Sequence, residues 1–252
     1  MTRLLTLLLV LLGLPAMAEE IVSGLSQSRV AINANYDGTA ILIYGTALRD
    51  APPPVWPMLQ VIITVEGPSS PLIIRHKERV AGLWLNRGSV RIDSAPSFYA
   101  VMSTGDMSDV LSEVEDRRYG ISIPQTIHAI GARMQRSDAG DYIAALQRIR
   151  MENAAYKLAP NSILLLQQSL FRTDVLLPSD LIEGTYKVRI FLTRGGKVVD
   201  MQESHIDVRK AGLERFLFNL AQDQPLIYGL MSLVLAAVAG WGASEAFRRL
   251  RL

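Results

Sequence analysis

Three histidines are the residues of this sequence best suited to metal or acid–base chemistry, and their spacing does not favour it. His76, His128 and His205 lie far apart along the chain. None belongs to a His-x-x-x-His pair, and no Asp or Glu spacing completes a metal signature. We therefore predict solvated or hydrogen-bonded histidines and no metal site. A soft copper site that combines His76 with Met102 and Met107 is the alternative.

Motifs for nucleophilic catalysis and phosphate binding are missing from the sequence. It contains no Gly-x-Ser-x-Gly elbow and no P-loop. The absence of Cys excludes disulfides, thiolate metal sites and Cys nucleophiles together. We predict a protein that is not an enzyme and needs no cofactor. The alternative is an enzyme whose unfamiliar site would gather Asp93, His128 and Arg133.

One acidic segment could be mistaken for a calcium site. Its carboxylates are Asp106, Asp109, Glu113, Glu115 and Asp116. A calcium loop needs oxygen ligands at alternate positions around a turning glycine, and this pattern is missing. The segment is therefore predicted to be the solvated face of a helix.

Length and composition describe a folded protein with two hydrophobic ends. The chain has 252 residues, enough for one or two domains with a buried core. Charged residues make up 20% and hydrophobic residues 49% of it, which is ordinary for a folded protein. The formal net charge is only +2 and no basic stripe occurs, so no nucleic-acid partner is expected.

The C-terminal stretch 225–247 is predicted to be a transmembrane helix. No charged residue occurs in 226–243, and a helix with a rise of about 1.5 Å per residue is then just long enough to cross a hydrocarbon core of about 30 Å. Tyr228 and Trp241 lie near its two ends, where amphipathic rings favour the headgroup level. The arginines that follow predict a cytoplasmic tail at 248–252. These are Arg248, Arg249 and Arg251.

Small residues recur every four positions along the predicted span. They are Ser232, Ala236, Gly240 and Ser244. Such a ridge of small side chains lets another helix approach closely, so we predict that it is a helix-packing face. The alternative is the ordinary abundance of small residues in membrane helices.

The N-terminal residues 1–18 have the pattern of an export signal. Arg3 supplies the positive end, 4–14 the apolar region, and Ala16-Met17-Ala18 a small-x-small cleavage site. Cleavage there would leave a mature chain that begins at Glu19, and an uncleaved anchor is the alternative. With the positive end of the signal and the C-terminal tail both in the cytoplasm, the intervening domain at 19–210 is expected in the periplasm of a bacterium, attached to the inner membrane.

Short apolar segments separated by turns predict β structure over the first part of this domain. Strands are expected at 29–35, 39–47, 59–66, 71–79 and 80–85. A turn with Asp-Gly chemistry at 35–38 separates the first two. Trp84 is predicted to be in the core, whereas Trp56, among prolines, is predicted to be a surface contact. Because no helix interrupts these strands, an antiparallel sandwich is favoured over a parallel sheet.

The middle of the domain is predicted to be a helical insertion at about 105–158. One charged helix is expected at 106–119, with acidic residues early and arginines late, as the helix dipole favours. A second is expected from about 138 to 158, where Pro160 follows. Further along, 163–171 is apolar enough for a central strand.

The domain is predicted to close with a hairpin that joins 185–193 to 198–208. Arg194-Gly195-Gly196-Lys197 supplies the turn. Residues 211–224 have amphipathic helical spacing, and lie either in the membrane interface or against the domain. The fold class expected is therefore mainly β, an immunoglobulin-like antiparallel β-sandwich with a helical insertion and one C-terminal transmembrane helix.

Several segments together resemble a known family. They are the signal, the Tyr36-Asp37-Gly38 turn, Gly82-Leu83-Trp84-Leu85-Asn86, Ala145-Leu146-Gln147-Arg148, Tyr156 and the C-terminal span. The chain resembles the Alph_Pro_TM family of alphaproteobacterial transmembrane proteins over nearly its full mature length. The resemblance brings no catalytic residues. It implies an association with sulfite-exporter-type permeases.

The function expected from these features is binding at a membrane. We predict a single-pass inner-membrane protein with a periplasmic binding domain, acting as an accessory or assembly subunit of a transporter complex. Its partner would be an integral membrane protein, with a sulfite-exporter-type permease as the candidate. The alternative is a membrane-tethered periplasmic protein that binds a small anion or a metal.

Overall fold

The computed structural model describes residues 19–33, 36–50, 52, 54, 56–130, 139–210 and 220–250. The chain divides into two compact units, of which the larger contains Asp37–Val208 and the smaller contains Arg209–Leu252. The predicted export signal at 1–18 lies outside the described residues, as does most of the predicted juxtamembrane helix at 211–224.

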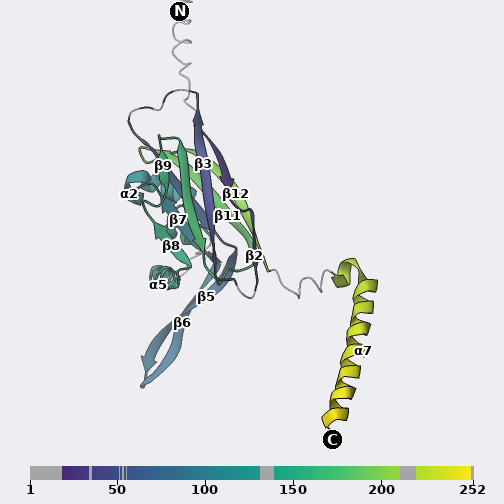
Figure 1. Ribbon diagram of the computed structural model, residues 1–252. Helices are drawn as coiled ribbons and strands as arrows, with labels where there is room; N and C mark the ends of the chain where they lie inside the picture. Colours follow the sequence, from purple (N-terminus) through teal and green to yellow (C-terminus); the bar gives the residue numbers. More distant parts are fainter. Residues whose placement is uncertain are drawn as a thin grey trace, which may run out of the picture. The chain divides into compact units, whose positions relative to one another are not determined.

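The larger unit contains two curled sheets (Figure 1). One sheet has the order β1-β3-β10-β9, made by Glu19–Leu25, Thr39–Arg49, Leu170–Leu177 and Leu164–Leu166. The other has the order β2-β12-β11-β4-β7-β8, made by Arg29–Ile32, Lys197–Lys210, Gly184–Arg194, Leu59–Glu66, Tyr99–Ser103 and Tyr156–Ala159. The pairings are antiparallel except that β7 and β8 run parallel.

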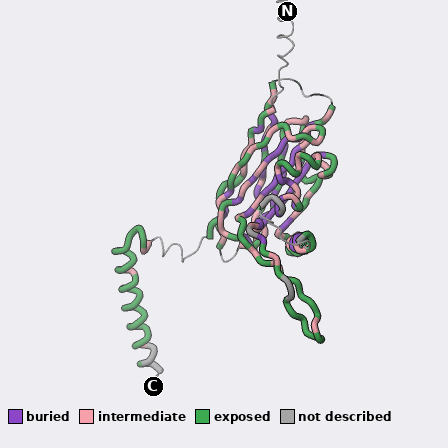
Figure 2. The backbone as a smooth tube through the Cα atoms, turned by 180° about the vertical axis from the view of Figure 1, so that it is seen from behind, coloured by how far each residue is buried: buried purple, intermediate pink, exposed green. Residues whose placement is uncertain are grey.

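Strand burial shows how the two sheets face one another. In β10 every second residue is buried and the others are exposed, the pattern of a strand with one dry face. In β4 nearly every residue is buried, including both Ile62 and Ile63. Since neighbouring side chains of a strand point to opposite faces, the six-stranded sheet must be covered on both sides. Figure 2 shows the resulting buried interior.

Helices in the described part of the chain between β7 and β8 cover the second face. They are α2 (Met107–Val110), α3 (Glu113–Tyr119), α4 (Ile123–Ile130) and α5 (Ala139–Glu152). The predicted single helix at 106–119 is in fact two, because Leu111 is extended and buried and Ser112 accepts a hydrogen bond from Glu115 N as the cap of α3. The predicted second helix also ends earlier than 158, because the chain turns into β8 and pairs with β7.

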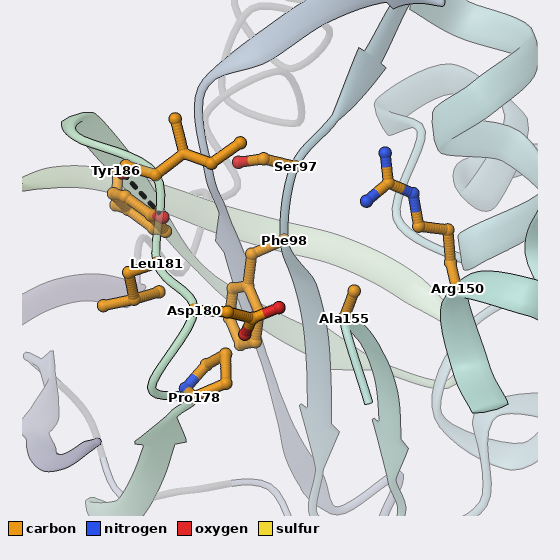
Figure 3. Close-up of a pocket in the computed structure, with 9 residues that line it drawn as sticks. Ser97, Phe98, Arg150, Ala155, Pro178, Asp180, Leu181 and Tyr186 are labelled. Atoms are coloured by element: carbon orange, nitrogen blue, oxygen red, sulfur yellow. Dashed lines mark hydrogen bonds between the residues drawn. The ribbon is translucent and has the colours of Figure 1, made fainter. Parts of the chain in front are cut away.

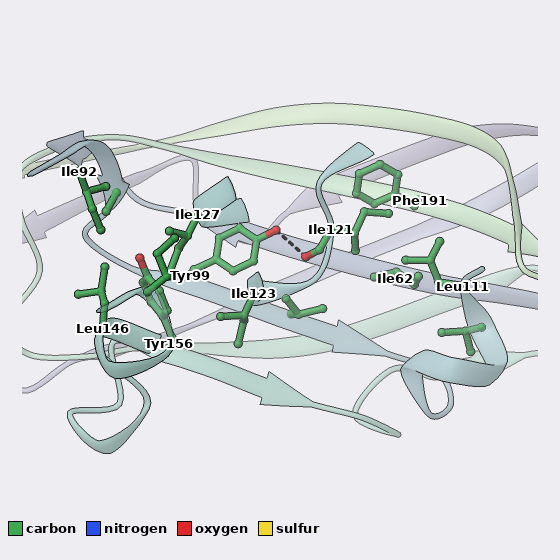
Figure 4. Close-up of a cluster of buried hydrophobic side chains, with 14 residues drawn as sticks. Ile62, Ile92, Tyr99, Leu111, Ile121, Ile123, Ile127, Leu146, Tyr156 and Phe191 are labelled. Atoms are coloured by element: carbon green, nitrogen blue, oxygen red, sulfur yellow. Dashed lines mark hydrogen bonds between the residues drawn. The ribbon is translucent and has the colours of Figure 1, made fainter. Parts of the chain in front are cut away.

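The helices and the sheet enclose a cluster of apolar side chains (Figure 4). Ile62 and Phe191 come from the sheet, and Ile127 and Leu146 from the helices. All are nearly inaccessible to water, so this second core fixes the helical layer on the sheet.

A third sheet is the long hairpin of β5 (Ser69–Val80) and β6 (Leu83–Pro96). Figure 1 shows its far end extending away from the rest of the unit. The prediction that Trp84 is a core residue was wrong: 67% of it is exposed near the end of this hairpin. Trp56 is exposed, as predicted.

Two other predictions were also wrong about which strands lie side by side. Residues 163–171 do not form a central strand; they contain the short edge strand β9 and the start of β10. The turn at 35–38 does not join a hairpin, because β3 pairs with β1 and β10 while β2 belongs to the other sheet. The predicted hairpin at 185–208 is confirmed as β11 and β12. The protein is mainly β, with one C-terminal apolar helix, α7 (Pro225–Leu250).

Candidate functional site

Helix α7 is the strongest functional element of the chain. Its segment Pro225–Glu245 is long and apolar enough to cross a membrane, with a mean hydropathy of 1.8. Pro225 suits the first helical position, where a missing N–H costs nothing. None of this apolar stretch is buried among the residues that the structure describes. A core helix of a soluble domain would bury its apolar residues, so this helix needs another apolar environment.

The small-residue ridge follows one side of α7. Ser232, Ala236, Gly240 and Ser244 lie on this helix at intervals of four residues and all are exposed. A Cβ atom built at Gly240 would meet no other atom within 4 Å. The described part of the chain therefore leaves this side of the helix open to another helix.

The predicted interface residues lie toward the two ends of the same helix. Tyr228 and Trp241 are thirteen positions apart, which is about 20 Å along a helix. Arg248 forms an ion pair with Glu245. The side chains of Arg249 and Arg251 lie outside the described residues.

The residues considered for a copper site are not brought together. His76 is exposed on β5, where its ring lies 6.5 Å from that of Tyr142. Met107 packs against the cluster of Figure 4, whereas Met102 is buried in β7 on the opposite face from Tyr99 and Val101 of that cluster. Among the described residues, no group of three or more His, Asp or Glu could hold a metal ion.

The other polar candidates have separate surroundings. His205 lies 3.3 Å from a carboxylate oxygen of Glu203 on the same strand, β12. The side chains of Asp93, His128 and Arg133 lie outside the described residues.

Two carboxylates of the acidic segment accept hydrogen bonds from other groups of the protein. Both oxygens of Asp116 accept hydrogen bonds from Ser122, from N at 2.7 Å and from Oγ at 2.6 Å, just before α4 begins. A Glu115 oxygen accepts from Val198 N at 3.2 Å. These carboxylates satisfy helix and strand termini that would otherwise lack partners.

Arg189, which the sequence did not single out, joins α3 to the six-stranded sheet. Arg189 of β11 donates to the carbonyl oxygens of Tyr119 at 2.8 Å and Gly120 at 3.1 Å. It also donates to the hydroxyl of Tyr99 at 3.1 Å. The carbonyls belong to the C-terminal end of a helix, where a cation is favoured. The sequence signal was a basic residue between apolar neighbours on a strand, which by itself is common.

Two buried tyrosines near this arginine keep their protons at neutral pH. Burial raises the pKa of Tyr156 to about 12, and burial raises the pKa of Tyr99 despite the nearby Arg189. Tyr99 donates to Ile121 O at 2.7 Å and Tyr156 to Pro96 O at 3.0 Å. Both hydroxyls therefore serve as donors that tie β7 and β8 to neighbouring segments, and neither is a ready base.

A small pocket with charged walls lies in the larger unit (Figure 3). It is lined by Ser97, Phe98, Arg150, Ala155, Pro178, Asp180, Leu181, Ile182 and Tyr186, and its volume is about 80 Å³. Space of this size holds several water molecules or a small ion. Ser97 Oγ is buried and has no hydrogen-bond partner in the described structure.

A β-rich body and an apolar helix long enough to cross a bilayer fit a membrane protein. The chain belongs to the family described as "Putative transmembrane protein (Alph_Pro_TM)", which matches residues 20–249. No curated protein matches the chain. Among solved structures, it is similar to Spo0M, the sporulation control protein of Bacillus subtilis, at 10% identity and a TM-score of 0.29. That similarity covers 82% of this chain and 55% of Spo0M.

Proposed function

We propose that this protein is an accessory or assembly subunit of a transporter complex in a bacterial inner membrane. The uncovered small-residue side of α7 supports this proposal most directly, because a single span gains little from small side chains unless another helix packs on them. The role is binding and not catalysis. Its partner is an integral membrane protein, with a sulfite-exporter-type permease as the candidate.

The sequence supplies the topology of the proposal. The positive end of the export signal and the C-terminal arginines both favour the cytoplasmic side, so the immunoglobulin-like domain between them is proposed to lie in the periplasm. Such an arrangement would allow α7 to contact the partner within the bilayer while the domain binds outside it.

The test is crosslinking in cells followed by affinity purification from native membranes. Gly240→Leu places a large side chain on the ridge, and Gly242→Leu places the same side chain about 200° around the helix. Neither new Cβ meets an atom of this chain within 4 Å, so both variants should fold alike. We expect a membrane protein captured by the wild type and Gly242→Leu and lost in Gly240→Leu.

Two other outcomes count against the proposal. If both variants capture the membrane protein equally, the contact does not lie on the ridge and is assigned to the larger unit. Absence of any specific membrane protein from the wild-type sample would remove the accessory-subunit function.

The pocket of Figure 3 favours a second candidate function, binding of a small anion. Arg150 supplies a guanidinium group and Ser97 an unpartnered hydroxyl, both of which can donate to an oxyanion. We expect sulfate or phosphate to raise the thermal unfolding temperature of the full chain, and Arg150→Gln to abolish that shift. Arg148→Gln is the matched control, because Arg148 is exposed and paired with Glu152 on the same helix.

A further inference from the structure

The far end of the β5–β6 hairpin has a defined backbone. Val80 pairs with Leu83, and the two residues between them, Ala81 and Gly82, have φ of 49° and 86°. Positive φ at both central positions is the geometry of a tight two-residue turn between antiparallel strands. We call residues 80–85 the hairpin tip.

The base of the hairpin is anchored and its tip is not. Ile92 and Ala95 of β6 belong to the buried cluster, and Leu72 and Ile74 of β5 pack against that cluster. His76 makes the ring contact with Tyr142 of α5. Beyond this point the described side chains are exposed, apart from a half-buried Val80 (Figure 2).

The tip exposes large apolar side chains on both faces of the ribbon. Leu83 is 68%, Trp84 67% and Leu85 46% exposed. Because successive residues of a strand point to opposite sides, the side chain of Trp84 projects from one face of the ribbon and those of Leu83 and Leu85 project from the other. A groove on a partner protein would cover one face. A medium that surrounds the ribbon would cover both.

Basic side chains lie beside the apolar tip and behind it. Arg75, Lys77 and Arg79 are exposed on β5, with Glu78 as the one acidic residue among them. Arg79 lies opposite Trp84 and Lys77 lies opposite Asn86 in the register. From Lys77 to the last pair at Val80 is three residues, or about 10 Å, which matches the depth to which interfacial segments enter a headgroup layer.

We propose that the hairpin tip inserts into the headgroup layer of an anionic phospholipid membrane, with Lys77 and Arg79 bound to lipid phosphates. An indole ring at headgroup depth, with one cation at the same level (Arg79) and another further from the turn (Lys77), is a favourable arrangement at such an interface. The proposal goes beyond the partner contact of α7 and does not require it. It rests on membrane anchoring, which keeps the larger unit at high effective concentration near lipid.

The three tryptophans allow a direct test in the full chain. Single-tryptophan variants retain Trp84 on the hairpin, Trp56 on a loop of the larger unit, or Trp241 on α7, with Phe at the other two positions. Each is reconstituted in phosphatidylcholine vesicles with or without phosphatidylglycerol, and brominated acyl chains serve as the quencher within the bilayer. Aqueous iodide serves as the quencher in solution.

We expect Trp84 emission to shift to the blue and to be quenched by brominated lipid in the anionic vesicles. This quenching should be lost in high salt and in the Lys77→Gln/Arg79→Gln variant, because screened or missing cations no longer attract the lipid. Trp56, which is 79% exposed, is the matched control and should remain accessible to iodide only. Trp241 should be quenched by brominated lipid in both kinds of vesicle.

Three other results would overturn the proposal. If iodide quenches Trp84 as it quenches Trp56, the tip stays in water. If neither quencher reaches Trp84, a protein surface covers it, and a dependence on the protein-to-lipid ratio would identify a second copy of this chain. Lipid quenching of Trp56 equal to that of Trp84 would mean unspecific adsorption. If brominated lipid fails to quench Trp241 alone, the result would count against the membrane anchor and the proposed function. The quenching of Trp84 would still decide whether the hairpin tip enters the membrane.

Discussion

Glu19 and Arg194 form an ion pair of 2.6 Å that joins the first described residue to the end of β11. Both side chains are largely buried, with 8% and 12% exposed. Arg49 of β3 lies 3.5 Å from the same carboxylate oxygen, and Arg194 also donates to Pro57 O. One carboxylate therefore links the two sheets, which are also joined by the hydrogen bond that Ile21 N donates to the carboxylate of Asp200 at 2.8 Å.

Glu19→Gln should destabilise the protein strongly, because it leaves two buried arginines without a carboxylate. Breaking one side of a buried ion pair costs about 3 kcal/mol of unfolding free energy. Glu20→Gln is the control, since Glu20 is exposed one residue further on and its replacement should change stability by less than about 0.5 kcal/mol. Urea unfolding of the full chain in detergent micelles measures both. Equal effects of the two substitutions would contradict this role of Glu19.

Arg189→Met should detach the C-terminal end of α3 from the sheet. It removes the hydrogen bonds to Tyr119 O, Gly120 O and Tyr99 Oη, and we expect a loss of about 2 kcal/mol. Arg189→Lys should lose less, because one ammonium keeps the charge but cannot reproduce the planar fork. The same unfolding measurement compares them with Lys187→Met on the same strand. A loss in Arg189→Met no larger than in Lys187→Met would refute the role of this arginine.

Gly45→Ala should be destabilising because β3 has no room for a methyl group there. Its Cβ would lie 2.5 Å from Phe171 Cζ and 2.7 Å from Val22 O, and the latter is backbone that cannot rotate away. We expect a loss of about 1–3 kcal/mol. Gly140→Ala in α5 meets nothing within 4 Å and should keep stability unchanged or raise it by about 0.5 kcal/mol. The thermal unfolding temperatures of the two variants should therefore move apart.

Stability should fall in alkali because of Tyr156. Its pKa is 10.0 in the unfolded chain and about 12 in the folded one, so above pH 10 the unfolded state releases a proton that the folded state keeps. The contribution is fully present below pH 10 and is lost as pH rises to 12, with a slope of about 1.4 kcal/mol per pH unit.

Tyr156→Phe should flatten that slope, although Tyr99 retains a contribution of the same sign. At pH 7 the variant should lose only about 1 kcal/mol, for the hydrogen bond to Pro96 O. Urea unfolding at several pH values measures both effects. An identical slope in wild type and variant would show that this hydroxyl does not cause the alkaline loss.

Local patterns predicted the elements whose partners are close in sequence. The hairpin of β11 and β12 was predictable because Gly195 and Gly196 take the positive φ that its turn needs, and strand alternation sets the register on either side. Helix α7 was predictable from composition alone, since an uncharged apolar run long enough to cross a bilayer has few other solutions.

Elements whose partners are distant in sequence were predicted less well. The apolar run at 163–171 predicts a central strand, but whether a strand is central depends on which strands pair on each side, and β9 pairs only with β10 among the described strands. Trp84 was assigned to the core from its residue type. Whether a tryptophan is buried depends on what packs over it, and only the structure shows that nothing in the described chain covers the hairpin tip.

The class of the protein can be predicted from its sequence alone: a β-rich body, a C-terminal apolar helix and the lack of known catalytic motifs. These follow from periodicity, composition and turn chemistry, which are properties of neighbouring residues. Only the tertiary structure decided that Arg189 meets the end of α3, that Arg150 and Ser97 line one pocket, and that the hairpin tip is exposed. Such contacts join residues far apart in the chain, and burial against distant partners, which no local pattern encodes, selects them.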